Sequence, residues 1–285
     1  MKKIRLATRS SPLALAQAKM VAEYLSARIA DAQFEFVEIK TSGDKQQTWS
    51  LEKYGGKGLL TKEIEEALLG HAAVIAVPSA KDLPSDCPDG LEIAGCLPRD
   101  ACADVLVIRD GVQVPNLIAT GSPRRRAQLK KLFPQAVWTE FRGNVHTRLK
   151  KLAGGAADAS VLSQAGLVRL KIDSYEGVQF RPLKPDVCVP AVAQGIIALQ
   201  CRSCDAPYFR QFTHAPTNEI FALERAFLTE LGGGCQSAYA ANCDGNVFRI
   251  FHEDCGFEKI EFPSGAQFAQ KLDIVKNLAR KCAYC

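Results

Sequence analysis

Segments with strand-like and helix-like patterns alternate along most of this chain of 285 residues. Residues 4–8 and 34–40 have the apolar patterning of strands, and 74–77 reads as a short buried strand. Helical patterns over 12–28 and 61–69 lie between them. This alternation predicts the α/β fold class, with a mixed or parallel sheet covered by helices on both faces.

The same succession occurs a second time further along the chain. LATRSSPLALAQAK (6–19) and IATGSPRRRAQLKK (118–131) both pass from an apolar strand through Thr and Ser-Pro into a helix that contains Ala-Gln. Ser11 and Ser122 are expected to be N-caps, each followed by Pro as the first helical residue. Because helix N-termini attract anions, the repeat predicts two similar α/β units, each with a helix start directed at one cleft.

The C-terminal part of the chain has a different pattern. Thr217 is expected to cap a helix that runs to Leu231 and stops at three glycines. Short strands and a helix over 267–281 follow, which predicts a small α+β unit. Residues 42–58 are polar, end in glycines and lack periodicity, as is typical of a functional loop.

The positive charge is concentrated in one stretch. The net charge is +5, yet residues 122–151 alone hold nine Lys or Arg against one acid, Glu140. Such a stretch indicates an anionic partner, which would be a nucleic acid, a phosphate or a polycarboxylate. Nucleic-acid binding favours basic and aromatic residues interleaved on one surface. This stretch holds only three aromatics, so we expect no nucleic-acid partner.

The remaining composition indicates a cytoplasmic protein. No uncharged apolar run reaches the roughly 18 residues of a membrane span, so we expect no membrane partner. The eleven cysteines are scattered in a long chain, as in reduced intracellular proteins. Two CxxC pairs, Cys201–Cys204 and Cys282–Cys285, lie far apart in sequence, and we predict no metal site.

Two single residues are candidates for chemistry, and each has a structural alternative. Cys235 follows three glycines, so it is either an accessible nucleophile or a buried thiol after a helix stop. Asp82 follows the predicted strand at 74–77, where α/β sheets bind ligands. It is either a general acid or base, or a residue that forms the turn before Pro84.

Four arginines lie near predicted helix starts. Arg124 and Arg125 fall in the first turn after Ser122, and Arg142 and Arg148 flank Gly143-Asn144. Cations are disfavoured at a helix N-terminus, so this placement favours a bound anion over a solvated basic face.

Several motifs together resemble those of the hydroxymethylbilane synthases, also called porphobilinogen deaminases. LGGGCQ and RGNVHTRLKKL in one chain are highly specific to that family. The resemblance spans roughly residues 4–240, and its segments are LATRSSPLALAQA, GGKGLLTKEIEEALL, SAKDLP, TGSPRRRAQL, FRGNVHTRLKKL, PAVAQGIIALQCR and ERAFLTELGGGCQ.

The resemblance implies two α/β domains of the type II periplasmic-binding-protein kind around a cleft, with a small α+β C-terminal domain. The expected domains are 1–97 with 191–212, then 98–190, then 216–285. It also implies that Cys235 carries a dipyrromethane cofactor through a thioether and that Asp82 is the catalytic carboxylate. Lys57 would belong to a lid loop over 42–58. The cofactor carboxylates would be bound by Lys81, Ser122, Arg124 and Arg125, and those of substrate and growing chain by Arg9, Ser11, Arg142 and Arg148.

The implied reaction is the head-to-tail condensation of four porphobilinogen molecules with loss of ammonia, ending in hydrolytic release of the linear tetrapyrrole hydroxymethylbilane. We expect a monomer that acts on this small-molecule substrate. Pro78 stands where the family has His, so a weakly active or inactive homologue is one alternative. A non-catalytic anion-binding protein of the periplasmic-binding-protein fold is the other.

Overall fold

The computed structural model describes residues 2–42, 61–84, 86–232 and 238–283. These form two compact units. Unit 1 contains the described residues of 2–42, 61–100 and 195–219, and unit 2 those of 101–194 and 220–283.

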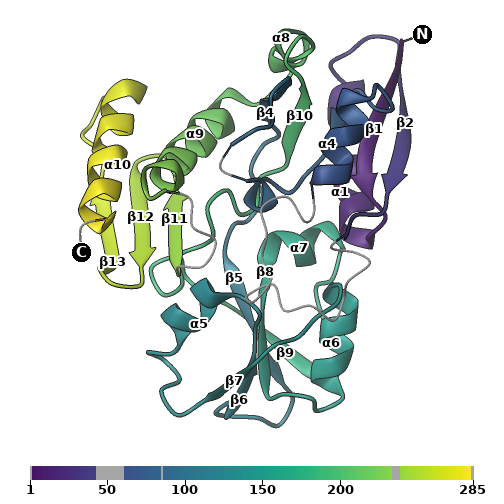
Figure 1. Cartoon of the computed structure of the whole chain (residues 1–285). Helices are drawn as coiled ribbons and strands as arrows, with labels where there is room; N and C mark the ends of the chain where they lie inside the picture. The colour runs from purple at the N-terminus through teal and green to yellow at the C-terminus, as the bar shows by residue number, and fades with distance from the viewer. Residues whose placement is uncertain (1, 43–60, 85, 233–237, 284–285) are drawn as a thin grey trace. The chain divides into compact units, whose positions relative to one another are not determined.

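Unit 1 is built on a five-stranded sheet in the order β2-β1-β3-β10-β4 (Figure 1). β1 runs parallel to β2 and β3, whereas β10 runs antiparallel to β3 and β4. The elements are β1 (Lys2–Arg9), α1 (Pro12–Ser26), β2 (Ala32–Ile39), α4 (Lys62–Leu69), β3 (Ile75–Ala76), the short 3-10 helix η1 (Ala80–Asp82), β4 (Leu91–Cys96), β10 (Ala198–Arg202) and α8 (Ala206–Arg210).

Unit 2 contains a second five-stranded sheet with the same pattern, in the order β7-β6-β8-β5-β9. β6 is parallel to β7 and β8, and β5 is antiparallel to β8 and β9. Its elements are β5 (Asp104–Arg109), β6 (Leu117–Ala119), α5 (Pro123–Leu129), β7 (Val137–Thr139), α6 (Val145–Ala153), β8 (Ala159–Ser163), α7 (Gln164–Arg169) and β9 (Val178–Pro182). The expected α/β class and the internal repeat are therefore confirmed, with β6–α5 repeating β1–α1.

The C-terminal part of unit 2 is a three-stranded antiparallel sheet, β11-β12-β13, with two long helices (Figure 1). Phe227 of α9, Phe248 of β12 and Phe262 after β13 lie in its core, where the Phe248 ring centroid is 6.1 Å from that of Phe227, in a T-shaped pair, and 6.1 Å from that of Phe262, in a tilted pair. This agrees with the predicted small α+β arrangement. Its elements are α9 (Ala215–Glu230), β11 (Tyr239–Cys243), β12 (Val247–His252), β13 (Gly256–Glu261) and α10 (Phe268–Ala283). The start of α9, up to residue 219, belongs to unit 1. Its separation as a third domain stays a prediction.

One predicted helix boundary is wrong. Thr217 was expected to cap a helix, but α9 already begins at Ala215 and Thr217 lies inside its first turn. The Thr217 hydroxyl accepts a hydrogen bond from the Arg99 amide at 3.2 Å and lies 2.8 Å from the His214 ring. The tertiary contact to residue 99, invisible in the local sequence, determines what this threonine does.

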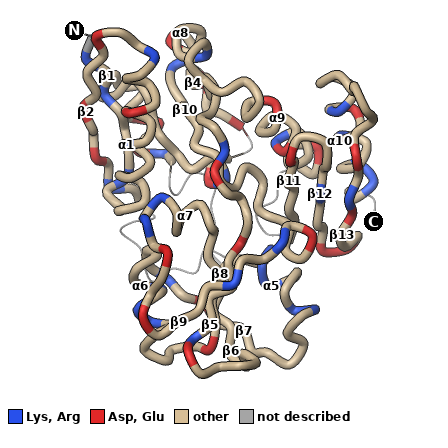
Figure 2. The backbone as a smooth tube through the Cα atoms, turned by 180° about the vertical axis from the view of Figure 1, so that it is seen from behind, with Lys and Arg blue, Asp and Glu red and all other residues tan. Residues whose placement is uncertain are grey.

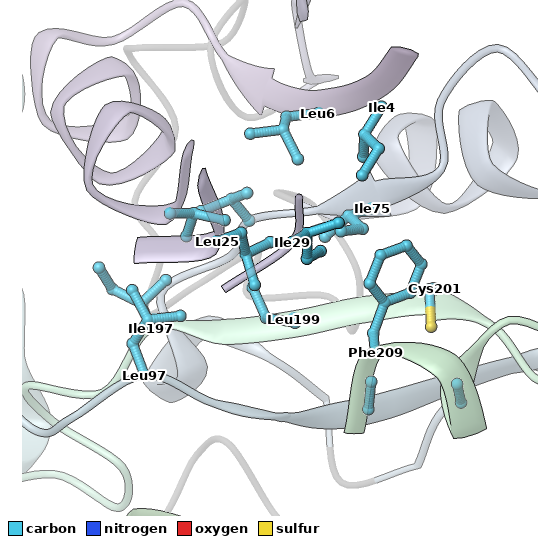
Figure 3. Packing of buried hydrophobic residues seen from close by; sticks show 14 residues of the cluster. Ile4, Leu6, Leu25, Ile29, Ile75, Leu97, Ile197, Leu199, Cys201 and Phe209 are labelled. Carbon is cyan, nitrogen blue, oxygen red and sulfur yellow. The ribbon is translucent and has the colours of Figure 1, made fainter. Parts of the chain in front are cut away.

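The core of unit 1 shows why the strand and helix patterns belong together. Ile4 and Leu6 alternate inward along β1, and Val21 and Leu25 lie four residues apart on one face of α1. They pack against Leu199 and other side chains of β3, β10 and α8 (Figure 3). Each such side chain contributes roughly 1.5–3 kcal/mol through removal of apolar surface from water.

A buried carboxylate fixes two chain segments in unit 2. Glu224 of α9 is fully buried, and its two oxygens accept hydrogen bonds from the amides of Ala193 at 2.6 Å and Cys243 at 2.7 Å. Ala193 has a positive φ of 58°, a conformation that side-chain-bearing residues keep only when their surroundings hold it.

Replacing Glu224 by Gln tests this anchor. An amide offers one acceptor and turns its NH2 group towards an amide N–H, so one buried bond is lost. We expect Glu224→Gln to lower the free energy of unfolding by about 1–3 kcal/mol in urea titrations. Glu230→Gln on the same helix, which breaks a partly exposed ion pair with Arg280, is the control and should cost less than about 1 kcal/mol. Equal effects would contradict the anchoring role.

Candidate active site

The start of α1 in unit 1 forms as the sequence predicts. Ser11 is the N-cap in extended conformation, its side chain accepts a hydrogen bond from the Ala14 amide at 3.3 Å, and Pro12 follows. The first turn of α1 contains no acidic residue, so nothing in that turn neutralises the positive end of the helix dipole.

A pocket opens beside this helix start. It brings three predicted site residues together, namely Arg9, Ser11 and Asp82, and it also includes Pro78. Its lining combines a cation, an anion, hydroxyls and aliphatic side chains: Arg9, Ser11, Leu13, Ala14, Gln17, Thr61, Ile64, Val77, Pro78, Ser79 and Asp82. A small ligand with charged groups beside apolar surface matches this lining.

Asp82 reaches the pocket because hydrogen bonds to the residues preceding β10 and to α1 hold the chain after β3. The Ala80 amide donates to Ile196 O at 3.0 Å, and the Asp82 amide donates to Ser79 O at 2.9 Å. Buried Gln17 of α1 donates from Nε2 to Ser79 Oγ at 2.9 Å, which links this turn to the α1 helix. Lys81 and Asp82 are both exposed at its end. The Pro78 carbonyl oxygen accepts a hydrogen bond from the Ala198 amide, so the chain after β3 stays hydrogen-bonded to β10 despite the proline.

Ser122 caps α5 as predicted and accepts a hydrogen bond from the Arg125 amide at 3.4 Å. Arg124 and Arg125 lie in the first turn of this helix and are both buried. They face an anion of the protein itself, which the sequence reasoning missed: Asp104, the first residue of β5, with no exposed surface.

Asp104 is bound by both guanidinium groups. Its Oδ2 accepts from Arg124 Nη1 at 2.7 Å, and its Oδ1 accepts from Arg125 Nη2 at 2.7 Å and Nε at 3.1 Å. Gln194 Nε2 adds a bond to Oδ1 at 2.9 Å. The cations at this helix start thus have an internal counter-ion, and the three residues keep a net charge of +1.

Arg142 and Arg148 lie around the start of α6, in the basic part of unit 2 (blue in Figure 2). Asn144 caps α6 by accepting from the Thr147 amide at 2.9 Å, and Arg148 Nε donates to Gly143 O at 2.9 Å. Burial, together with the charges of Arg125 and Arg142, lowers the pKa of Arg148 to about 10. Arg148 remains charged at neutral pH, so its repulsion by two neighbouring cations favours binding of an anion here.

Two predicted residues, Cys235 and Lys57, lie outside the described residues. Among the described cysteines, Cys96, Cys188 and Cys201 are buried. Burial raises the pKa of the Cys188 and Cys201 thiols to about 12, so both are protonated and unreactive at neutral pH. Cys204 is exposed, and Cys285 is outside the described part.

The described ranges contain no cluster of three or more His, Cys, Asp or Glu side chains arranged to hold a metal ion. Within the same ranges, no helix has the length and apolar character needed to cross a membrane.

The fold defines an α/β protein built on two five-stranded mixed sheets with the same strand pattern. Residues 4–209 match the family model described as porphobilinogen deaminase, dipyromethane cofactor binding domain. Porphobilinogen deaminase of Brevibacillus brevis is 40% identical over 261 residues, covering 88% of this chain and 84% of the relative. That of Paracoccus denitrificans is 42% identical over 260 residues, covering 87% and 82%. The chain belongs to the porphobilinogen deaminase family.

Solved structures give more distant likenesses. The periplasmic VFT2 domain of Bordetella pertussis BvgS has 17% identity and a TM-score of 0.45, covering 79% of this chain and 92% of that one. An ABC transporter protein of Parabacteroides distasonis has 13% identity and a TM-score of 0.44, covering 99% and 95%. The family assignment therefore rests on the sequence relatives.

The ion-paired group around Asp104 generates a stability prediction. Asp104→Asn should lower the free energy of unfolding by about 3–5 kcal/mol at pH 7, because it leaves two buried guanidinium groups without their counter-ion. Asp110→Asn, at the exposed position directly after the same strand, is the control and should change it by no more than about 0.5 kcal/mol.

The same pair predicts a pH dependence. Burial alone raises the pKa of Asp104, but the charges and hydrogen bonds of Arg124 and Arg125 outweigh it and hold that pKa well below its usual range. A carboxyl with a depressed folded-state pKa contributes fully above its unfolded pKa of about 4, and that contribution falls at lower pH. The difference in unfolding free energy between wild type and Asp104→Asn should be constant from about pH 7 to 5 and shrink below about pH 4. A difference independent of pH would contradict the ion pair.

Proposed function

We propose that this chain is a hydroxymethylbilane synthase that condenses four porphobilinogen molecules head to tail and releases the linear tetrapyrrole. The observation that carries the proposal is the pocket of unit 1, where Arg9, Ser11 and Asp82 line one cavity. Family membership supplies the reaction, and this pocket supplies groups of matching chemistry.

Arg9 and the start of α1 are suited to a substrate carboxylate. A guanidinium forms charge-assisted hydrogen bonds with carboxylates, often two in parallel. The α1 dipole adds a positive end at the same pocket, and the Ser11 hydroxyl, which accepts from the Ala14 amide, still has a proton to donate. We assign Arg9 and Ser11 to the acidic side chains of porphobilinogen.

Asp82 is suited to the positive charge that develops on the substrate. Loss of ammonia breaks the bond between the aminomethyl carbon and nitrogen, and the pyrrole nitrogen becomes electron-poor as that bond breaks. A fixed carboxylate that faces this nitrogen lowers the barrier by stabilising the charge. The hydrogen bonds within and around Ser79 to Asp82 fix the backbone that carries this carboxylate.

The dipyrromethane cofactor supplies the free pyrrole carbon at which condensation starts. We assign its attachment to Cys235 and its carboxylates to Lys81, Ser122, Arg124 and Arg125. The start of α5 suits these cofactor carboxylates because Arg124 and Arg125 carry two positive charges and Asp104 neutralises only one of them. Arg142 and Arg148 would bind the carboxylates of incoming substrate and growing chain, and Lys57 would belong to the loop that covers the site.

We further propose that the enzyme is a cytoplasmic monomer without a nucleic-acid partner. The protonated, buried thiols of Cys188 and Cys201 are compatible with a reduced compartment. The aromatic residues of the basic stretch support no nucleic-acid surface, because Phe141 lies in the core of unit 2.

The cofactor assignment predicts the mass of the purified protein. Protein made in a haem-synthesising host should carry the added mass of two linked pyrroles, and Cys235→Ser should carry none and be inactive. Cys204→Ser, at an exposed cysteine, is the control and should keep both adduct and activity. A bare polypeptide mass for the wild type would favour the non-catalytic anion-binding alternative.

The role of Asp82 predicts a kinetic defect without unfolding. Asp82→Asn should reduce kcat by about 100-fold or more, because the amide cannot compensate a developing positive charge. Its thermal unfolding should match that of the wild type, since this side chain is exposed. Asp89→Asn, at another exposed position before β4, serves as the control. Near-normal kcat in Asp82→Asn would leave Asp82 as a turn residue only.

A further inference from the structure

Thr61 is an unusual member of the pocket in unit 1. It is the residue before α4, 2% exposed, and it lines the same cavity as Arg9, Ser11 and Asp82. A threonine at this position often caps the helix with its hydroxyl. Here the side chain makes no capping hydrogen bond, although the Thr61 carbonyl accepts the ordinary helical bond from the Glu65 amide at 2.9 Å.

The hydroxyl oxygen of Thr61 has no hydrogen-bond partner among the described residues, and it is shielded from solvent. Buried polar groups are nearly always paired, since an unpaired one costs free energy comparable to its lost hydration. The other buried polar side chain of the pocket follows this rule, because Gln17 is bonded to Ser79. No described residue supplies the missing partner of Thr61, and a ligand in the pocket that Thr61 lines can supply it.

The surroundings indicate the chemistry of that partner. Ile64 and Val77 line the same cavity as Thr61, and both are apolar and buried. Arg9 and the start of α1 make the pocket favourable for a carboxylate. A hydroxyl beside a carboxylate acts as donor, because an ionised carboxylate only accepts.

We propose that Thr61 binds the pyrrole substrate, donating a hydrogen bond from its hydroxyl to a carboxylate that Arg9 also binds. This inference rests on the proposed function and adds a binding residue to it. Thr61 orients the substrate relative to Asp82 and takes no part in proton transfer. It also contributes to specificity, because a pyrrole without that carboxylate leaves the hydroxyl unpaired and binds less well.

Two substitutions separate the hydroxyl from the shape of the side chain. Thr61→Val replaces the hydroxyl by a methyl group of similar size, and Thr61→Ser keeps the hydroxyl but loses the methyl group. In steady-state assays of full-length, cofactor-loaded enzyme, Thr61→Val should raise the KM for porphobilinogen about tenfold or more, the loss expected for a hydrogen bond to a charged group. Its kcat should change much less than its KM, and Thr61→Ser should stay within about threefold of wild type in both.

Thermal unfolding distinguishes binding from a structural role. Because the hydroxyl has no partner within the described protein, Thr61→Val should unfold at the same or a higher temperature than wild type. A clearly lower unfolding temperature, or an unchanged KM in an active Thr61→Val enzyme, would overturn the inference while leaving the proposed function intact. An inactive wild type with no pyrrole adduct would instead overturn the proposed function, and this inference with it.

Discussion

The arrangement of unit 2 depends on one buried carboxylate. Asp104 begins β5, and it binds Arg124 and Arg125 of α5 as well as Gln194 at the end of the segment after β9. Arg124 and Gln128 also reach Val189 O, at 2.6 and 3.1 Å, so the same cluster holds residues 188–194 against α5. Without its anion, this helix start would hold two buried like charges, which a protein interior does not tolerate.

The two five-stranded sheets share one strand–cap–helix arrangement. In each unit a parallel strand, β1 or β6, leads through a serine cap and proline into a helix, so a helix N-terminus lies beyond the carboxyl end of the strand. In unit 1 that end lines an open pocket with Arg9 and Asp82. In unit 2 the equivalent position is filled by arginines, whose charge Asp104 only half neutralises. One topology thus provides a pocket in unit 1 and a place with surplus positive charge in unit 2.

Local sequence predicted the elements well where local forces determine them. The caps at Ser11, Ser122 and Asn144 were predictable, since a serine or asparagine beside a helical pattern meets its N–H partner within three residues. Thr217 failed because its partner is the amide of Arg99, more than a hundred residues away. Asp104 was missed for the same reason, although an acid inside the apolar run ADVLVI was a signal that could have found it.

The sequence by itself determined the α/β class, the internal repeat, the family and the identity of the candidate site residues, because these follow from periodicity and from motifs contiguous in the chain. Only the tertiary structure decided which of them meet. It gathered Arg9, Ser11 and Asp82 in one pocket and gave Arg124 and Arg125 an internal counter-ion. It also left the Thr61 hydroxyl without a hydrogen-bond partner among the described residues. The physical reason is that burial and charge pairing depend on side chains that strand order brings together from distant parts of the sequence, and no local pattern encodes those distances.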